Sequence, residues 1–122
     1  MPLFLYSGDS HDTPMLDPSP VLIEFTASWC QPCKRMSDVM SQVVDNYGDQ
    51  VTHTRFDTSL PSNLQFAARQ GITSIPTILI FARGVEARRL TGYHDVEAVS
   101  AVLDEILTDT DVSVRGEIEL EA

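Results

Sequence analysis

The sequence is poor in lysine, in cysteine and in long apolar runs. Of its 122 residues only Lys34 is a lysine, and 8 Lys and Arg stand against 18 Asp and Glu, which gives a formal net charge of −10. Nucleic acids and anionic membranes attract clustered basic side chains, so this charge balance argues against binding to either. The longest apolar run, Thr77 to Ala82, is far shorter than the roughly 20 residues that a membrane-spanning helix needs.

Two further absences bear on where the protein works and how it is built. The first residues, Met1 to Tyr6, are briefly apolar but carry no basic region, and Gly8 and Asp9 follow too soon for an export signal. We therefore expect a cytoplasmic protein. Two cysteines cannot form the several bridges of a small secreted scaffold, and in a reducing cytosol they need another explanation.

What the sequence does contain is the pattern of one α/β domain. Its length suits a single domain, and 43% of its residues are hydrophobic, as in ordinary globular proteins. Apolar spacing predicts, in order, strand 21–26, a helix from Cys30 to Tyr47, strand 51–57, helix 61–70, strands 78–81 and 85–91, and a helix capped by Asp95. Parallel strands need crossover helices, whereas the short turn at residues 83–84 allows an antiparallel pair. We predict a central mixed sheet with helices on both faces.

The two ends of the chain lack this pattern. We assign residues 1–108 to the domain, with residues 1–20 as an irregular N-terminal segment that contains several prolines and aspartates. Residues 109–122 alternate acidic with small apolar side chains, and we expect an acidic, mobile C-terminal tail. A strand at residues 112–114 or 117–120 is the alternative.

The two cysteines, Cys30 and Cys33, are separated by two residues and admit three interpretations: a redox-active dithiol, half of a metal site, or a pair with no joint role. A purely structural disulfide is the weakest idea, because closing a loop of about four residues contributes only about 2 kcal/mol. Zinc needs about four ligands, and His11, His53 and His94 are scattered along the chain. We therefore predict no metal site.

The residues around the cysteines favour the redox interpretation. Pro32 comes just inside the predicted helix, where its missing N–H costs nothing, so Cys30 lies at the helix N-terminus. Unpaired backbone N–H groups and the helix dipole stabilise a thiolate there. Lys34 and Arg35 add positive charge in the next turn. The thiolate is the nucleophile of disulfide exchange, and Cys33 follows one turn later, where it can attack the resulting mixed disulfide.

Three segments together resemble the thioredoxin family. They are Ala27-Ser28-Trp29-Cys30-Gln31-Pro32-Cys33-Lys34, Gly71-Ile72-Thr73-Ser74-Ile75-Pro76-Thr77 and Thr91-Gly92, in the order and spacing of that family. The resemblance covers about residues 21–107 and implies the thioredoxin fold. A lone Cys-x-x-Cys motif is a weak signal, but Trp-Cys-x-Pro-Cys after a buried strand, with Ile-Pro-Thr further along the chain, is a strong one.

The resemblance implies roles for the residues that match the family's motifs. Cys30 matches the exposed nucleophile and Cys33 the buried resolving thiol. Pro76 matches a proline that follows a cis peptide bond, faces the dithiol and helps to place the substrate backbone. Three more positions match the rim of an apolar groove for an extended peptide: Trp29, Ile75 and Gly92. The alternatives are core packing for Ile75 and a simple turn for Gly92.

The sequence departs from the family pattern in the first strand. Glu24 stands where the family usually has aspartate. A carboxyl in a buried strand is expected to have a raised pKa, because desolvation disfavours its charged form, so Glu24 is a candidate general base for the resolving thiol. The alternative is an edge position that reaches solvent. His53 falls where the family often has a lysine facing this acid, and it is either a partner of Glu24 or a satisfied strand histidine.

We therefore predict a cytoplasmic thiol–disulfide oxidoreductase that reduces protein disulfides through Cys30 and Cys33. Gln31 replaces the family's usual glycine, and with Pro32 and Lys34 it is expected to tune the dithiol. The resemblance implies that no bound cofactor is needed, that the clients are disulfide-containing proteins, and that a flavoprotein thioredoxin reductase supplies electrons. The main alternative is a thioredoxin-fold interaction or assembly module whose dithiol is idle or senses redox state. A cytoplasmic location alone disfavours an oxidase or isomerase.

Overall fold

The computed structural model describes the backbone of residues 19–121 and the side chains of residues 19–108. Its elements are β1 (Val21–Thr26), α2 (Gln31–Tyr47), the 3-10 helix η2 (Gly48–Gln50), β2 (Thr52–Asp57), α3 (Pro61–Arg69), β3 (Thr77–Ala82), β4 (Val85–Thr91) and α4 (Val96–Glu121). This succession is the predicted one. The irregular segment predicted for residues 1–20 lies outside the described residues except for its last two.

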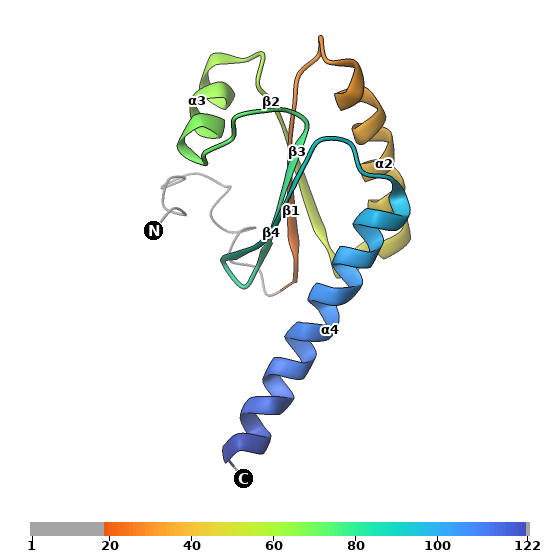
Figure 1. Cartoon of the computed structure of the whole chain (residues 1–122), viewed down its shortest axis with the longest axis vertical. Coiled ribbons are helices and arrows are strands. Elements are labelled where there is room, and N and C mark those ends of the chain that lie inside the picture. Colours follow the sequence, from red (N-terminus) through yellow and green to blue (C-terminus); the bar gives the residue numbers. More distant parts are fainter. Residues whose placement is uncertain (1–18, 122) are drawn as a thin grey trace.

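The four strands of the described part form one mixed sheet in the order β2–β1–β3–β4 (Figure 1). β1 pairs in parallel with β2, whereas β1 with β3 and β3 with β4 are antiparallel. α2 makes the crossover that the parallel pair requires, and Arg83 and Gly84 turn the chain directly from β3 into β4. β1 is therefore an inner strand, and all six of its residues are buried. The predicted mixed sheet is confirmed.

Helices cover both faces of the sheet, as predicted (Figure 1). α2 and α4 enclose the larger core on one face, and α3 closes a second core, rich in phenylalanine, on the other. Alternation along β1 sends Leu22 into the first core and Ile23 and Phe25 into the second. Glu24 consequently lies on the side of α2, where the two cysteines are also found.

α2 has clear signals at both of its ends. Cys30 is its N-cap, Pro32 occupies the first turn, and Gly48 closes the helix with a φ of 55° and a backbone N–H that donates to the carbonyl oxygen of Val44. Proline is pre-organised for a first turn, and glycine adopts positive φ without a steric penalty. The helix buries an apolar stripe against the sheet: Cys33, Met36, Val39, Met40 and Val43.

α4 begins as predicted but ends much later. Asp95 caps it, because its Oδ1 accepts a hydrogen bond of 2.8 Å from the backbone N–H of Ala98. Val99 and Leu103 are fully buried against the sheet. The backbone stays helical to Glu121, so the alternative of a strand at residues 112–114 or 117–120 is wrong. The mobility expected of residues 109–122 stays a prediction, because their side chains lie outside the described ones. None of the helices described in residues 19–121 combines the length and apolar character needed to cross a bilayer.

β4 forms one edge of the described sheet and exposes six of its seven residues. Arg89 makes a bidentate ion pair with Glu86, at 2.9 and 3.0 Å, and donates a hydrogen bond to the carbonyl oxygen of Gln70. Arg88 pairs with Glu105 of α4 at 3.0 Å. The contacts with Gln70 and Glu105 connect this outer strand to the end of α3 and to α4.

Candidate functional site

The two cysteines are joined in a disulfide at the start of α2. Their Cα atoms lie 5.2 Å apart, and the backbone N–H of Cys33 donates to Cys30 Sγ at 3.2 Å. Cys33 is completely buried, whereas Cys30 keeps 6% of its surface exposed. A pair with no joint role is therefore wrong, and Cys30 is the sulfur that a partner can reach. Its position at the helix N-terminus, predicted from Pro32, is confirmed.

The peptide bond between Ile75 and Pro76 is cis, as the resemblance implied. Ile75 packs against the small cluster formed by Ala27, Cys30 and Cys33, which places this bond beside the disulfide. Ile75 also packs against the phenylalanine-rich core, so core packing accounts for part of its burial.

Gly92 is tied to the same segment. Its backbone N–H donates to the carbonyl oxygen of Pro76 at 2.8 Å, and its φ is 86°, a conformation that favours glycine. The structure thus brings Gly92 together with Pro76 and, through Ile75, with the disulfide.

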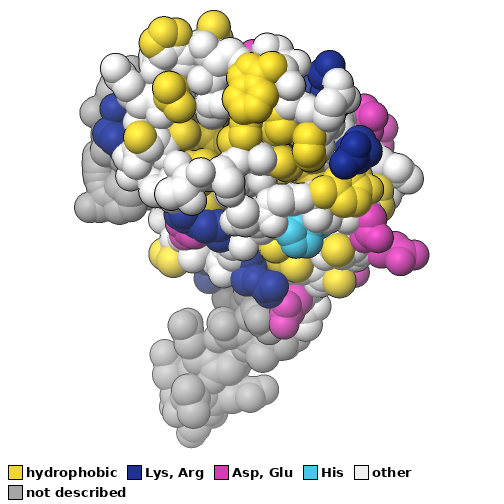
Figure 2. Space-filling view, turned by 45° about the horizontal axis from the view of Figure 1, so that its top comes forward, with side chains coloured by type: hydrophobic (Ala, Val, Ile, Leu, Met, Phe, Trp, Pro, Cys, Tyr) yellow, Lys and Arg dark blue, Asp and Glu magenta, His cyan; other side chains and the backbone are white. Residues whose placement is uncertain are grey.

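Several large apolar side chains are exposed at the surface, among them Trp29, which directly precedes Cys30. Trp29 is 72% exposed, Leu60 is 54% exposed and Tyr93 is 47% exposed. Figure 2 shows hydrophobic side chains gathered on the upper part of this face, with most charged side chains towards its margin. Leu60 and Tyr93 were not predicted; Tyr93 could have been found, because an aromatic residue directly follows the glycine of the Thr-Gly motif.

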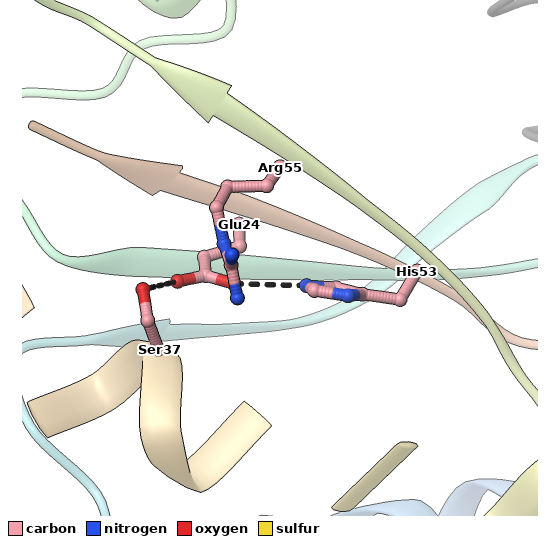
Figure 3. A network of polar contacts seen from close by, with 4 residues as sticks. All are labelled: Glu24, Ser37, His53 and Arg55. Carbon is pink, nitrogen blue, oxygen red and sulfur yellow. Dashed lines mark hydrogen bonds and ion pairs between the residues drawn. The ribbon is translucent and has the colours of Figure 1, made fainter. Parts of the chain in front are cut away.

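Glu24 lies at the centre of a four-residue polar network (Figure 3). Its Oε2 accepts a hydrogen bond of 2.5 Å from Ser37 Oγ of α2. Its Oε1 lies 2.8 Å from His53 Nε2 and 3.0 Å from Arg55 Nε, both on β2. Glu24 is completely buried, so an edge position is wrong. The predicted partnership of His53 with this acid is confirmed.

The raised pKa expected for Glu24 is wrong. Burial alone would raise the pKa, but hydrogen bonds from His53 and Ser37, together with the charge and hydrogen bond of Arg55, lower it below the ordinary glutamate value. Each of these contacts stabilises the ionised carboxylate. Glu24 is therefore a buried anion with a partner on each oxygen.

Arg55 and Ser37 are the members of this network that were not predicted. A signal for Arg55 existed: it lies two residues after His53, and alternate residues of a strand share a face. The sheet register also sets Arg55 directly opposite Glu24. Ser37 lies four residues after Cys33, which puts both on one face of α2.

The remaining candidate residues lie at the surface or take part in local contacts. Gln31, Pro32 and Lys34 are exposed in the first turn of α2. The Arg35 guanidinium lies 5.7 Å from the centre of the Tyr93 ring. His94 Nδ1 lies 3.1 Å from the carbonyl oxygen of Gly92, and His11 lies outside the described residues. Within the described residues no three His, Cys, Asp or Glu side chains are grouped so that they could hold a metal ion.

Comparison with known proteins identifies the family. The sequence pattern of the family described as Thioredoxin matches residues 4–105. A thioredoxin of Mycolicibacterium smegmatis is 34% identical over 102 residues, which covers 83% of this chain and 91% of that protein. A bifunctional thioredoxin reductase/thioredoxin of Mycobacterium leprae is 30% identical over 88 residues, covering 72% of this chain and 19% of that protein. A solved mutant thioredoxin from Halobacterium salinarum has a TM-score of 0.68 at 24% identity, covering 76% of this chain and 79% of that one. The chain belongs to the thioredoxin family and has its fold, with a redox-active disulfide at Cys30 and Cys33.

Proposed function

We propose that the protein is a thiol–disulfide oxidoreductase that reduces disulfide bonds of other proteins. The observation that carries this proposal is the asymmetry of the Cys30–Cys33 pair, in which one sulfur is accessible and the other is completely buried. Such a pair suits a two-step exchange with one attacking and one resolving thiol. Family membership supports the same reaction.

In the first step, the thiolate of reduced Cys30 attacks one sulfur of a client disulfide. The client S–S bond breaks, a mixed disulfide forms between Cys30 and the client, and the other client sulfur leaves as a thiolate. The helix N-terminus stabilises the Cys30 thiolate, because unpaired backbone N–H groups point towards it. One of these, the N–H of Cys33, already donates to Cys30 Sγ.

In the second step, the Cys33 thiol loses its proton and attacks Cys30 Sγ. The mixed disulfide breaks, the client leaves with both sulfurs reduced, and the Cys30–Cys33 disulfide forms again. The buried position of Cys33 keeps it from competing for clients. Glu24, an anion on the α2 side of β1, is the proposed acceptor of the Cys33 proton.

The client is held by the apolar rim and by backbone groups. Trp29 offers a large exposed ring, and the Ile75–Pro76 segment, to which Gly92 is bonded, lies beside the disulfide. An extended client segment that carries a disulfide would contact both of these regions. Two electrons per turnover must come from a reductant, for which a flavoprotein thioredoxin reductase is the proposed partner. The M. leprae relative, named a bifunctional thioredoxin reductase/thioredoxin, supports this pairing. A cytoplasmic location remains a prediction.

Reduction of insulin disulfides tests the proposal. We expect turnover by the native protein with dithiothreitol and with a thioredoxin reductase. Cys30→Ser should abolish turnover, because no accessible thiol remains, whereas Cys33→Ser should accumulate a mixed disulfide visible by mass spectrometry. Full turnover by Cys30→Ser would contradict the proposal. A native protein that binds a partner but never turns over would instead be an interaction module with an idle dithiol.

A further inference from the structure

The Glu24 carboxylate is fixed from two sides by elements that the chain brings together only on folding. Ser37 of α2 holds Oε2, and Arg55 and His53 of β2 hold Oε1 (Figure 3). With both oxygens engaged, the carboxylate cannot rotate without losing a charge-assisted hydrogen bond. Its orientation relative to α2 is therefore set by Ser37.

Ser37 lies on the face of α2 that carries Cys33. The two residues are four apart, and residues at this spacing lie one above the other on a helix, with side chains tilted towards its N-terminus. The Ser37 side chain, which bonds Glu24, is therefore tilted towards the helical turn that contains Cys33. No other residue of α2 bonds Glu24 in the described part of the chain.

Cys33 needs a proton acceptor inside the protein. Its side chain is completely buried, so bulk water cannot take the proton directly when the thiol becomes a nucleophile. Glu24 is also completely buried, so it cannot return a proton to bulk water without an intermediate. Both residues need polar groups that bridge to the solvent.

A pocket of about 340 Å³ lies beside this polar network. It is lined by groups from the loop after β1, from α2 and from β2: Thr26, Ala27, Ser28, Lys34, Ser37, Asp38, Arg55 and Asp57. Ser37 and Arg55, the two network members missed by sequence reasoning, are thus in contact with both the buried carboxylate and the pocket. Ala27 also packs against the two cysteines.

We propose that Ser37 and Arg55 are positioning residues for the second step of exchange, fixing the Glu24 carboxylate on the Cys33 side of α2 and joining it to the solvent of the pocket. This inference rests on the proposed exchange reaction. It means that proton transfer from Cys33 to Glu24 also depends on Ser37 and Arg55.

The proton balance of the step is as follows. Cys33 gives its proton to the Ser37 hydroxyl, directly or through one water, as the hydroxyl passes its own proton to Glu24. The Cys33 sulfur then forms a bond to Cys30 Sγ, and the bond between Cys30 and the client breaks. The client leaves as a thiolate and takes a proton from solvent. Glu24 later returns its proton through Ser37 to the pocket.

The charged groups around Glu24 come from two elements. β2 contributes His53 and Arg55 in direct contact, with Asp57 further along at the pocket. α2 contributes Lys34 and Asp38 at the pocket, besides Ser37. β3, the other neighbour of β1, carries no ionisable side chain. The Arg55 guanidinium lies 3.0 Å from Glu24 Oε1 and stabilises the ionised carboxylate, so its removal should weaken the preference of Glu24 for the ionised form.

The test uses the reduced full-length protein with dithiobisnitrobenzoate, an aromatic disulfide whose thiolate product is coloured. Cys30 attack releases a first equivalent of colour, and Cys33 attack on the mixed disulfide releases a second. Ser37→Ala should slow the second phase about tenfold and leave the rate of the first phase within about twofold of the native value. The tenfold effect is smaller than the 10²–10⁴-fold that general acid–base groups typically contribute, because Ser37 acts through Glu24. Ser37→Thr, which keeps a hydroxyl, should restore the second phase.

Arg55→Ala supplies an independent readout. Because Arg55 lowers the pKa of Glu24, its loss should make the second phase fall more steeply than in the native protein as the pH is lowered from about 7 to 5. Ser41→Ala, an exposed serine one turn further along α2, and Arg88→Ala, whose ion pair with Glu105 is at the surface, are the matched controls.

The outcomes separate this inference from the proposed function. A native protein without a first phase would refute the exchange reaction itself. A normal first phase with an unchanged second phase in Ser37→Ala would overturn the positioning role, as would equal slowing of both phases or equal slowing by Ser41→Ala. If the rate of the second phase in Arg55→Ala fell with pH in parallel with that of the native protein, the role of Arg55 would be overturned.

Discussion

The backbone N–H of Gly92 donates a 2.8 Å hydrogen bond to the carbonyl oxygen of Pro76. This contact joins the loop after β4 to the segment before β3 at the point where Ile75 packs against the two cysteines. One wall of the proposed client groove is thus built by backbone groups from two loops. Its shape depends on backbone conformation rather than on any one side chain.

Gly92→Ala tests this dependence. The φ of Gly92 is 86°, and an L-residue in the left-handed region costs about 1–2 kcal/mol. No atom lies within 4 Å of the position that a Cβ would take, so a loss cannot be attributed to a clash. We expect urea denaturation to give a free energy of unfolding lower by about that amount. Gly92→Asn should lose less, because asparagine tolerates positive φ; equal losses would argue against a backbone cause.

Trp29→Ala should weaken client binding without affecting the chemistry. Trp29 is 72% exposed, so its removal leaves no internal cavity and folding should be unchanged. We expect kcat/KM for insulin reduction to fall about tenfold, since exposed tryptophans often dominate recognition. Reaction of Cys30 with dithiobisnitrobenzoate should change little, because a small disulfide does not span the groove.

The control for Trp29 is Val85→Ala. Val85 is 66% exposed but lies at the turn between β3 and β4, at the opposite end of the sheet from Cys30 (Figure 1). Insulin reduction by this variant should match that of the native protein. Comparable losses in both variants would mean that Trp29 has no specific part in client binding.

Glu24→Gln should change the pH dependence of stability. Contacts in the folded state lower the pKa of Glu24, so its stabilising contribution is complete above the ordinary glutamate pKa of about 4.3. As the pH falls below that value, the unfolded chain takes up the proton first, and the contribution is lost towards the lower pKa of the folded state. The variant should therefore be less stable by about 1–3 kcal/mol at pH 7, with a difference that shrinks in acid.

Urea denaturation between about pH 7 and 3 measures that difference. Glu105→Gln serves as the control, because Glu105 is 61% exposed and pairs with Arg88 at the surface. Such a pair contributes at most about 1 kcal/mol. A constant difference between native protein and Glu24→Gln across the range would contradict the lowered pKa of Glu24.

Leu103→Ala and Leu64→Ala compare a buried with an exposed leucine, both in helices. Leu103 is completely buried in the core between α4 and the sheet, whereas Leu64 of α3 is 56% exposed. The first variant should lose about 2–5 kcal/mol of unfolding free energy, because it leaves a cavity. The second should change it by less than about 0.5 kcal/mol. Similar losses would mean that the two cores are assembled differently from the described structure.

Features with a local physical cause could be predicted from the sequence. The apolar run of residues 21–26 coincides with β1, because an inner strand buries both of its faces. Pro32 and Gly48 mark the two ends of α2, and Asp95 caps α4, because capping depends on a few adjacent residues. The cis bond before Pro76 followed from the family motif rather than from local chemistry.

Features that depend on contacts between distant segments were harder to predict. Burial of Glu24 was expected, but its pKa is lowered by His53, Ser37 and Arg55 together, and the last two are brought to it by the helix crossing and the sheet register. From the sequence, only the desolvation of Glu24 and its contact with His53 could be predicted. The end of α4 was also missed, because residues after Thr108 lack the regular apolar stripe that marked its first turns.

The edge formed by β4 has a consequence for how the molecule meets other sheets. An unpaired edge strand can template pairing with another chain, and charged side chains discourage this. Here Glu86, Arg88 and Arg89 are all exposed on β4, and each arginine is engaged with a neighbouring carboxylate. A second strand that approached this edge would have to disrupt these ion pairs. This edge of the described sheet is thereby protected from pairing with the strands of other chains.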